Sequence, residues 1–246
     1  MTVNTFDKSV VLISGGSSGI GLAIAQILDS LGAQLVLIGN DKDQYESIAN
    51  KFARKPLFIL GDIANSAVSS EAIEQAISNF GKLNIVIANA GIYLTKDGWT
   101  VPPAQIDKVI GVNISGVVHL THAAINHYLK VGGGDIVVTS SVAGLVDVAW
   151  ESVYSATKHA VTSFVNSTRH RLAGKNIRIG SIEPGIVQTP LWVTNSDQTG
   201  VEVPELVKND RALKPEDVAD GVIFMLSRPR HVNIRDVVML PTDQPF

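Results

Sequence analysis

A tyrosine and a lysine stand four residues apart in the stretch YSATK, and Ser141 precedes the tyrosine by thirteen residues. Tyr154 and Lys158, at positions i and i+4, would share one face of a helix, where an ammonium group can approach a phenol. A free tyrosine has a pKa of about 10 and exchanges protons poorly near neutral pH. A nearby lysine charge favours the phenolate and lowers that pKa, so the pair could serve as general acid and base. The same spacing also occurs by chance in surface helices.

A glycine-rich stretch near the N-terminus, ISGGSSGIG, admits two kinds of chemistry. Residues Gly15 to Gly19 match G-x-S-x-G, the strand-to-helix turn that presents a nucleophilic serine, here Ser17, in many hydrolases. Residues Gly15 to Gly21 match G-x-x-x-G-x-G, a turn whose backbone amides cradle a pyrophosphate. The third glycine and the position directly after the first predicted strand favour the dinucleotide site. Ser17 and Ser18 are then small hydrogen-bonding loop residues, and a serine hydrolase is the alternative.

The elements that must position these residues alternate as short Val- and Ile-rich runs and longer stretches of helical period. This pattern predicts an α/β fold, a Rossmann-like doubly wound parallel sheet with helices on both faces. The runs are nearly unbroken in apolar residues, which indicates burial on both sides of the sheet. About seven parallel strands are predicted, at residues 9–14, 34–39, 56–60, 84–88, 135–140, 177–182 and 236–240.

Three helices are clear from periodicity and capping signals. The first spans 21–33 and ends at Gly32, the second is one long helix over 103–130, and the third begins with Pro215 in its first turn. About 20 residues after Thr189 lack a clear period. We therefore expect a substrate loop at residues 190–213.

Composition favours a globular protein that acts on small molecules. The chain has 246 residues, of which 45% are hydrophobic, and one catalytic domain over 1–246 is the simplest organisation. A net charge of -3 without basic runs argues against nucleic acid or membrane as a partner. The absence of cysteine excludes disulfides and thiolate zinc sites, and no metal site is expected. Without a signal-like or membrane-spanning run, a cytoplasmic location is expected.

Further motifs accompany the tyrosine and lysine in a recognisable order: GDI at 61–63, ANAG at 88–91, Asn113 in VNISG, and EPGIVQT at 183–189. Together with Ser141 they resemble the classical short-chain dehydrogenase/reductase family over nearly the whole chain. Alanine replaces the first Asn of that family's N-N-A-G turn, and the usual final VDGG is missing. Within the family, ANAGIY and WESVYSATKHAV resemble ribitol 2-dehydrogenase and related carbonyl reductases.

The resemblance implies an NAD(P)-dependent oxidoreductase that interconverts a secondary alcohol and a ketone by hydride transfer. Tyr154 would be the acid/base, Ser141 would stabilise the developing oxyanion, Lys158 would also bind the ribose hydroxyls, and Asn113 would hold a water. A homodimer or homotetramer is implied too, and a non-catalytic nucleotide-binding protein is a further alternative. The implied cofactor-binding residues are Gly15, Ser17, Ser18, Gly19, Ile20, Gly21, Asn40, Asp41, Asp62, Ile63, Asn89, Ala90, Gly91, Tyr154, Lys158, Pro184, Gly185, Val187 and Thr189.

The choice of cofactor depends on the end of the second strand, where the family places an acid for NAD or an arginine for NADP. Here Gly39 and Asn40 occupy those positions, and Asp41 could take the acidic role from the next one. Ser18 offers no charge to a phosphate, and Lys42 is the one nearby cation. We expect NAD(H), with NADP(H) as the alternative.

Residues that follow the N-A-G turn, Ser141 and Thr189 should surround the substrate, and most of them are apolar or aromatic. A polyol site should instead supply several hydrogen bonds to hydroxyls. The resemblance to ribitol 2-dehydrogenase favours a sugar alcohol such as ribitol, whereas the composition of the pocket favours a bulkier ketone or secondary alcohol. The candidate substrate residues are Tyr93, Val142, Trp150, Glu151 and Trp192.

Overall fold

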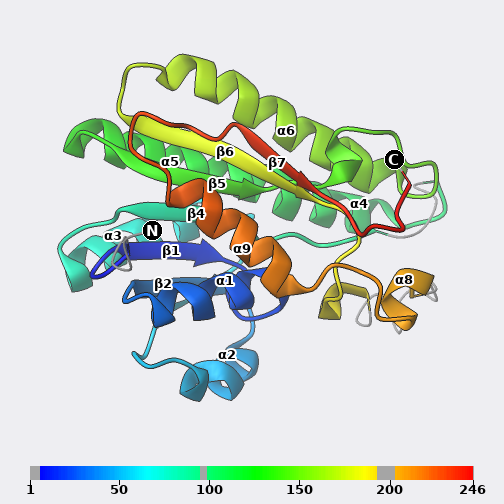
Figure 1. Ribbon diagram of the computed structural model, residues 1–246, viewed down its shortest axis with the longest axis horizontal. Helices are drawn as coiled ribbons and strands as arrows, with labels where there is room; N and C mark the ends of the chain where they lie inside the picture. The colour runs from blue at the N-terminus through cyan, green and yellow to red at the C-terminus, as the bar shows by residue number, and fades with distance from the viewer. Residues whose placement is uncertain (1–5, 95–98, 193–202, 246) are drawn as a thin grey trace.

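Seven parallel strands form one sheet in the order β3-β2-β1-β4-β5-β6-β7 (Figure 1). The computed structural model describes residues 6–94, 99–192 and 203–245. The strand order reverses between β1 and β4, which is the switch point of a doubly wound sheet, and this confirms the predicted fold class. The strands are β1 Val10–Ser14, β2 Gln34–Gly39, β3 Leu57–Leu60, β4 Ile85–Ala88, β5 Gly134–Thr139, β6 Ile177–Pro184 and β7 Asp236–Met239, each within two residues of its predicted bounds.

Helices cover both faces of the sheet. Side chains of α1 and α9 pack on one face, and those of α3, α5 and α6 pack on the other. The helices are α1 Gly19–Ser30, α2 Lys42–Ile48, α3 Ser66–Phe80, α4 Pro103–Ile110, α5 Val117–Val131, α6 Ser152–Leu172, α8 Glu205–Lys208 and α9 Pro215–Leu226. Short helical turns lie at η1 Ala49–Lys51, η2 Gly111–Gly116 and η3 Val142–Gly144.

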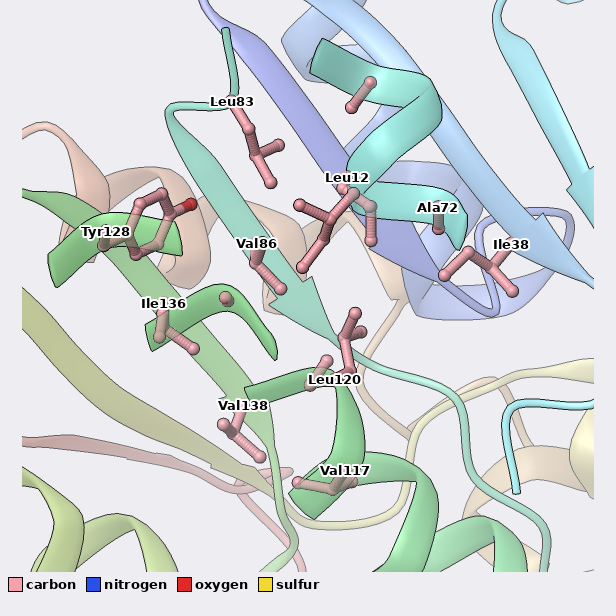
Figure 2. Packing of buried hydrophobic residues seen from close by; sticks show 14 of the residues in the cluster. Leu12, Ile38, Ala72, Leu83, Val86, Val117, Leu120, Tyr128, Ile136 and Val138 are labelled. Atoms are coloured by element: carbon pink, nitrogen blue, oxygen red, sulfur yellow. The ribbon is translucent and has the colours of Figure 1, made fainter. Parts of the chain in front are cut away.

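Alternate residues of the central strands supply the two halves of the core. Leu12 of β1 faces the α3 and α5 side, where it packs with Val86 and Leu120 (Figure 2), whereas Ile13 faces α1 and α9. All four side chains are fully buried. Each burial of this kind stabilises the fold by about 1.5–3 kcal/mol. The rigid sheet that results fixes the strand ends at which the site is built.

The segment 103–131 forms one continuous helical run, as predicted, but with a π-helical turn in its middle. That turn, η2, contains Asn113, and π turns of this kind are frequent at functional sites. Of the helices that the structure describes, this run is long and apolar enough to cross a membrane by length and composition alone. Its apolar residues Val117, Leu120 and Ala124 instead pack in the core, on the face of the sheet that α3 and α6 also cover.

The predicted substrate loop, residues 190–213, is partly structured. Its helix α8 lies at Glu205–Lys208, and Leu213 returns to pair with Val187 in an isolated parallel bridge. Residues 193–202 of the predicted loop lie outside the described residues. The bridge holds the end of this segment against the chain that leaves β6.

Candidate active site

The glycine turn joins β1 to α1 with no room for larger residues. Gly15 and Gly19 have φ of +66° and +50°, a left-handed conformation that favours glycine. A Cβ on Gly21 would lie 2.1 Å from the Gly15 carbonyl oxygen, so helix and turn are in direct contact there. Ser18 caps α1 without a side-chain hydrogen bond, which leaves the first-turn amides of the helix available to a phosphate. These features fit a dinucleotide pyrophosphate.

Ser17 lacks the surroundings of a nucleophile. Its side chain is buried, and its Oγ donates a 2.6 Å hydrogen bond to Oε1 of Gln44. Ser17 does not line the cleft described below, and no histidine is among the described residues that do. A serine nucleophile needs an adjacent base to take its proton. The hydrolase interpretation of G-x-S-x-G therefore has no support in the geometry.

Asn89 ties together the ends of three strands. Its Nδ2 lies 3.3 Å from the carbonyl oxygens of both Ser14 and Gly15, and its Oδ1 accepts a hydrogen bond from Thr139 Oγ1 at 3.1 Å. The Ser14 hydroxyl in turn accepts the backbone N–H groups of Asn89 and Ala90, each at 3.1 Å. Asn89 therefore holds the glycine turn in place, in agreement with the turn-stabilising role that its position suggests.

Lys158 is a buried ammonium group at the centre of the site. Its Nζ donates to the Thr139 carbonyl oxygen at 3.0 Å and lies 5.6 Å from the centre of the Tyr154 ring. Only 4% of the residue is exposed, and this burial lowers the pKa of Lys158 to about 8. The helix α6 therefore places the two side chains of the i, i+4 pair together, as the spacing predicts.

Tyr154 is half-buried and meets the hydroxyl of Ser141. Burial raises its pKa above the ordinary value, the charge of Glu151 raises it further, and a hydrogen bond with Ser141 lowers it. The sequence predicts that Lys158 lowers the pKa of Tyr154. In the structure burial is the largest influence on this pKa, ahead of the Glu151 charge and the Ser141 hydrogen bond. The phenol is therefore held protonated, as a proton donor must be.

Asn113 is fully buried behind the cleft wall and does not line the cleft. Its Oδ1 accepts from the Ile92 backbone N–H at 2.8 Å, and its Nδ2 donates to the Ile92 carbonyl at 2.9 Å and to Thr157 Oγ1 at 3.2 Å. Both amide donors are thus used within the protein. The side chain fixes the backbone that follows the N-A-G turn. A water bound to Asn113 would have to donate its hydrogen bond to Oδ1, because both protons of Nδ2 are already donated.

At the substrate end of the site, Tyr93 contacts both Glu151 and Trp192. The Tyr93 hydroxyl donates a short hydrogen bond to Oε2 of Glu151. The Tyr93 ring meets the rings of Tyr154 and Trp192 edge to face, at 4.7 and 4.9 Å between ring centres. Burial raises the pKa of Glu151 and of Tyr93. These residues were predicted from the sequence to contact the substrate, but nothing in the sequence indicates that they contact one another in this way.

These side chains surround a cleft of about 650 Å³, whose lining includes both the glycine turn and Trp192. Most of the predicted cofactor residues line it, together with Ser141, Tyr93, Val142 and Glu151. Asp62 instead caps a local turn by accepting the Ala64 N–H at 2.9 Å, while Ile63 is buried in the core. Trp150 is 65% exposed. The predicted site residues that do not line the cleft are Ser17, Gly21, Asp62, Ile63, Asn113 and Trp150.

Several cleft residues were not identified from the sequence. Gln44 lies in the first turn of α2, three residues after the Asp41 cap. That spacing from the helix cap is a signal in the sequence that could have identified it. Gln105 and Lys108 reach the cleft from α4, on the same run that carries Asn113. Gln244 comes from the C-terminal segment, and no local pattern indicates its approach. Only the tertiary structure brings these residues to the site.

The adenosine end of the cleft, as the strand order places it, carries Asn40, Asp41 and Gln44 from the β2–α2 segment. Asp41 is exposed and accepts the Gln44 backbone N–H at 2.9 Å, so its carboxylate also caps α2. Lys42 points to solvent and pairs with Glu46 at 3.7 Å. The cleft-lining residues of this segment therefore carry no positive charge.

The doubly wound sheet, the glycine turn and the tyrosine–lysine pair at one cleft define an α/β dinucleotide-dependent oxidoreductase. The family model of short chain dehydrogenases matches residues 9–200, and the chain belongs to that family. It is therefore an NAD(P)-dependent oxidoreductase of the short-chain type.

Similar proteins agree with this assignment. An uncharacterized oxidoreductase of Staphylococcus aureus is 32% identical over 242 residues, which cover 98% of this chain and 100% of that protein. The closed form of serine dehydrogenase with NADP+ has a TM-score of 0.90 and 26% identity over 96% of both chains. The 3-ketoacyl-(acyl-carrier-protein) reductase of Brucella melitensis with NADH has a TM-score of 0.85 and 27% identity, over 96% of this chain and 98% of that one. None of these three is described as a ribitol dehydrogenase, so the finer subgroup prediction is not supported.

Proposed function

We propose that this enzyme interconverts a secondary alcohol and a ketone, with Tyr154 as the proton donor and acceptor. The observation that carries the proposal is the convergence of Ser141, Tyr154 and Lys158 on the cleft that the glycine turn also lines. A reacting carbonyl between the Ser141 and Tyr154 hydroxyls would receive two hydrogen bonds at its oxygen. Such donors stabilise the charge that develops there during reduction. The nicotinamide cofactor supplies or accepts the hydride when it is bound.

The protein's own groups divide the remaining work. Tyr154, held protonated by burial, donates its proton to the developing alkoxide in reduction and takes the alcohol proton in oxidation. Lys158, whose ammonium lies beside the phenol ring, favours the phenolate that remains. Asn89 and Asn113 act as positioning residues, because they hold the two backbone segments that line the cofactor side of the cleft.

NAD(H) is proposed as the preferred cofactor. A 2'-phosphate usually requires charge-assisted hydrogen bonds, and the β2–α2 segment offers only Asn40, Asp41 and Gln44 to the cleft. The Asp41 carboxylate would repel a phosphate and can accept hydrogen bonds from ribose hydroxyls. Related structures hold either cofactor, NADP+ in serine dehydrogenase and NADH in the ketoacyl reductase, so the preference has to come from this segment.

The substrate is proposed to be a ketone or its secondary alcohol, and a sugar alcohol such as ribitol is the alternative. The walls contributed by Leu94, Val142 and Trp192 are apolar, and Tyr93 and Glu151 form a hydrogen-bonded polar pair beside them. This arrangement favours a substrate with a short apolar body and few polar groups. An extended polyol would leave several hydroxyls without partners.

The experiment is a turnover assay of the purified enzyme with NADH and NADPH against ketones, ketoses and diketones, and with NAD+ and NADP+ against the matching alcohols. We expect turnover of at least one secondary alcohol or ketone, with a higher kcat/KM for NAD(H) than for NADP(H). Turnover with NADP(H) alone would contradict the cofactor proposal. An enzyme that binds NADH but reduces no ketone would favour the non-catalytic alternative.

A further inference from the structure

Glu151 is a buried carboxyl group at the substrate end of the cleft, and the acid/base chemistry above does not use it. It is only 7% exposed, yet it lines the cleft within reach of Tyr154. The Tyr93 hydroxyl is its hydrogen-bond partner within the described part of the chain. No lysine, arginine or histidine in residues 6–94, 99–192 and 203–245 forms an ion pair with it.

A buried carboxylate without a cation is unfavourable in the free enzyme. Burial removes hydration that a single neutral hydroxyl donor cannot replace, and the raised pKa of Glu151 reflects this cost. A ligand that brings a cationic donor to this carboxyl would restore the missing interaction. Charge-assisted hydrogen bonds of that kind are roughly twice as strong as neutral ones.

The aromatic cluster that Tyr93 forms next to Glu151 indicates the same ligand chemistry. Tyr93 is fixed between Tyr154 and Trp192 by two edge-to-face contacts, and its hydroxyl in turn fixes Glu151. Aromatic faces attract cations, and a carboxylate beside them adds a direct partner. The buried cation of the site, Lys158, is already bound to the Thr139 carbonyl and lies against the ring of Tyr154.

We propose that Glu151, Tyr93 and Trp192 form a subsite for an ammonium group carried close to the reacting carbon, so that amino alcohols and amino ketones are the preferred substrate class. This inference rests on the proposed function and names the substrate class of that same site. A neutral hydroxyl at the same place would be accepted less well, and a methyl group least, since it leaves the carboxyl unpaired.

A matched series of alcohols tests the subsite directly. The compounds 1-amino-2-propanol, 1,2-propanediol and 2-butanol share the reacting carbinol and differ only in an ammonium, hydroxyl or methyl group. Each is assayed as both enantiomers with NAD+ at a pH between the pKa values of the carboxyl and the ammonium. Because the ammonium group also changes the intrinsic reactivity, the measured quantity is the ratio of kcat/KM between wild type and Glu151→Gln for each compound.

Glu151→Gln is expected to lower kcat/KM for the amino alcohol by about 10- to 100-fold relative to its effect on 2-butanol, with the diol between them. Glu74→Gln, an exposed glutamate on α3, is the matched control and should leave all three ratios equal. Equal ratios for Glu151→Gln would overturn the proposal. So would the same loss in Lys108→Ala, the lysine of α4 that lines the same cleft, because the charge partner would then belong to the protein.

Binding to the enzyme–NAD+ complex gives a second readout that does not require turnover. Isothermal titration of the three compounds should show the amino alcohol binding most tightly, and Glu151→Gln should remove that preference while the melting temperature and NADH binding stay close to wild type. Absence of any preference in wild type would contradict the subsite. Absence of turnover with an intact preference would contradict the proposed function alone.

Discussion

The two ends of the cleft are built in different ways. At the cofactor end the backbone determines the shape, because Gly15, Gly19 and Gly21 allow turn and helix to touch and Asn89 pins the strand ends. At the substrate end side chains determine it, through the Tyr93–Glu151 hydrogen bond and the contact of Tyr93 with Trp192. A backbone site accepts almost no substitution, whereas a side-chain site can be altered one contact at a time. The reaction class is therefore set at one end and the substrate at the other.

Gly21→Ala should have the largest effect at the cofactor end. The new Cβ would overlap the Gly15 carbonyl oxygen at 2.1 Å and Asn89 Nδ2 at 2.6 Å, so α1 must separate from the turn. Overpacking of this kind costs about 1–3 kcal/mol, and a loss of that size in NADH binding corresponds to roughly 5- to 150-fold in affinity. Fluorescence titration of NADH measures it.

The matched control is Gly174→Ala. Gly174 also has a positive φ, of +78°, but a Cβ there would meet nothing within 4 Å. The control should lower the melting temperature slightly through backbone strain and leave NADH affinity intact. If the two variants bound NADH equally well, contact between helix and turn would not shape the cofactor site.

Asn89→Ala should have the next largest effect. It removes the hydrogen bonds to the Ser14 and Gly15 carbonyls and leaves the Thr139 hydroxyl without its acceptor. A loss of about 1–2 kcal/mol in unfolding free energy is expected from unsatisfied buried groups. Denaturant titration measures this, with Asn79→Ala on the exposed face of α3 as the control. If Asn89→Ala were as stable as Asn79→Ala, the hydrogen bonds of Asn89 would not hold the strand ends in place.

The same contrast explains what could be predicted from the sequence. The strands and the long helix were visible because apolar periodicity reports burial, and the glycine turn was visible because only glycine fits there. The π turn around Asn113 carries no such signal, and the close approach of its Gly116 to Ile63 appears only in the folded chain. The Tyr93–Glu151 contact joins residues 58 positions apart, and its effect on the pKa of Tyr154 appears only in three dimensions.

A smaller effect is expected from Asp41→Asn, which tests the electrostatics of the cofactor end without altering its backbone. Asparagine can still accept the Gln44 N–H and cap α2, so the fold should be preserved. Removal of the carboxylate charge should raise kcat/KM for NADPH relative to NADH by up to about 10-fold, or about 1.4 kcal/mol. Lys42→Ala is the companion variant, and it should leave the ratio unchanged because Lys42 pairs with Glu46. If the ratio of kcat/KM for NADPH to that for NADH were unchanged in Asp41→Asn, the Asp41 carboxylate would not determine the cofactor preference.

The smallest effect concerns the pH dependence at the substrate end. Burial and then the Glu151 charge raise the pKa of Tyr154, so Glu151→Gln should lower that pKa. Alcohol oxidation requires the phenolate, and its rate therefore rises with pH until Tyr154 has lost its proton. In the variant this rise should move to lower pH by about one unit, measured as kcat/KM for 2-butanol against pH. A shift to higher pH would show that Glu151 does not act on Tyr154 through its charge.

The most direct test of the central claim is the pair of measurements on Tyr154→Phe, namely turnover and NADH binding by the same protein sample. The substitution keeps the ring that contacts Tyr93 and removes only the hydroxyl. We predict that the variant binds NADH with wild-type affinity and that kcat for every substrate falls by at least about 100-fold, as loss of an acid/base group implies. Wild-type turnover in this variant would contradict the assignment of Tyr154 as the acid/base group.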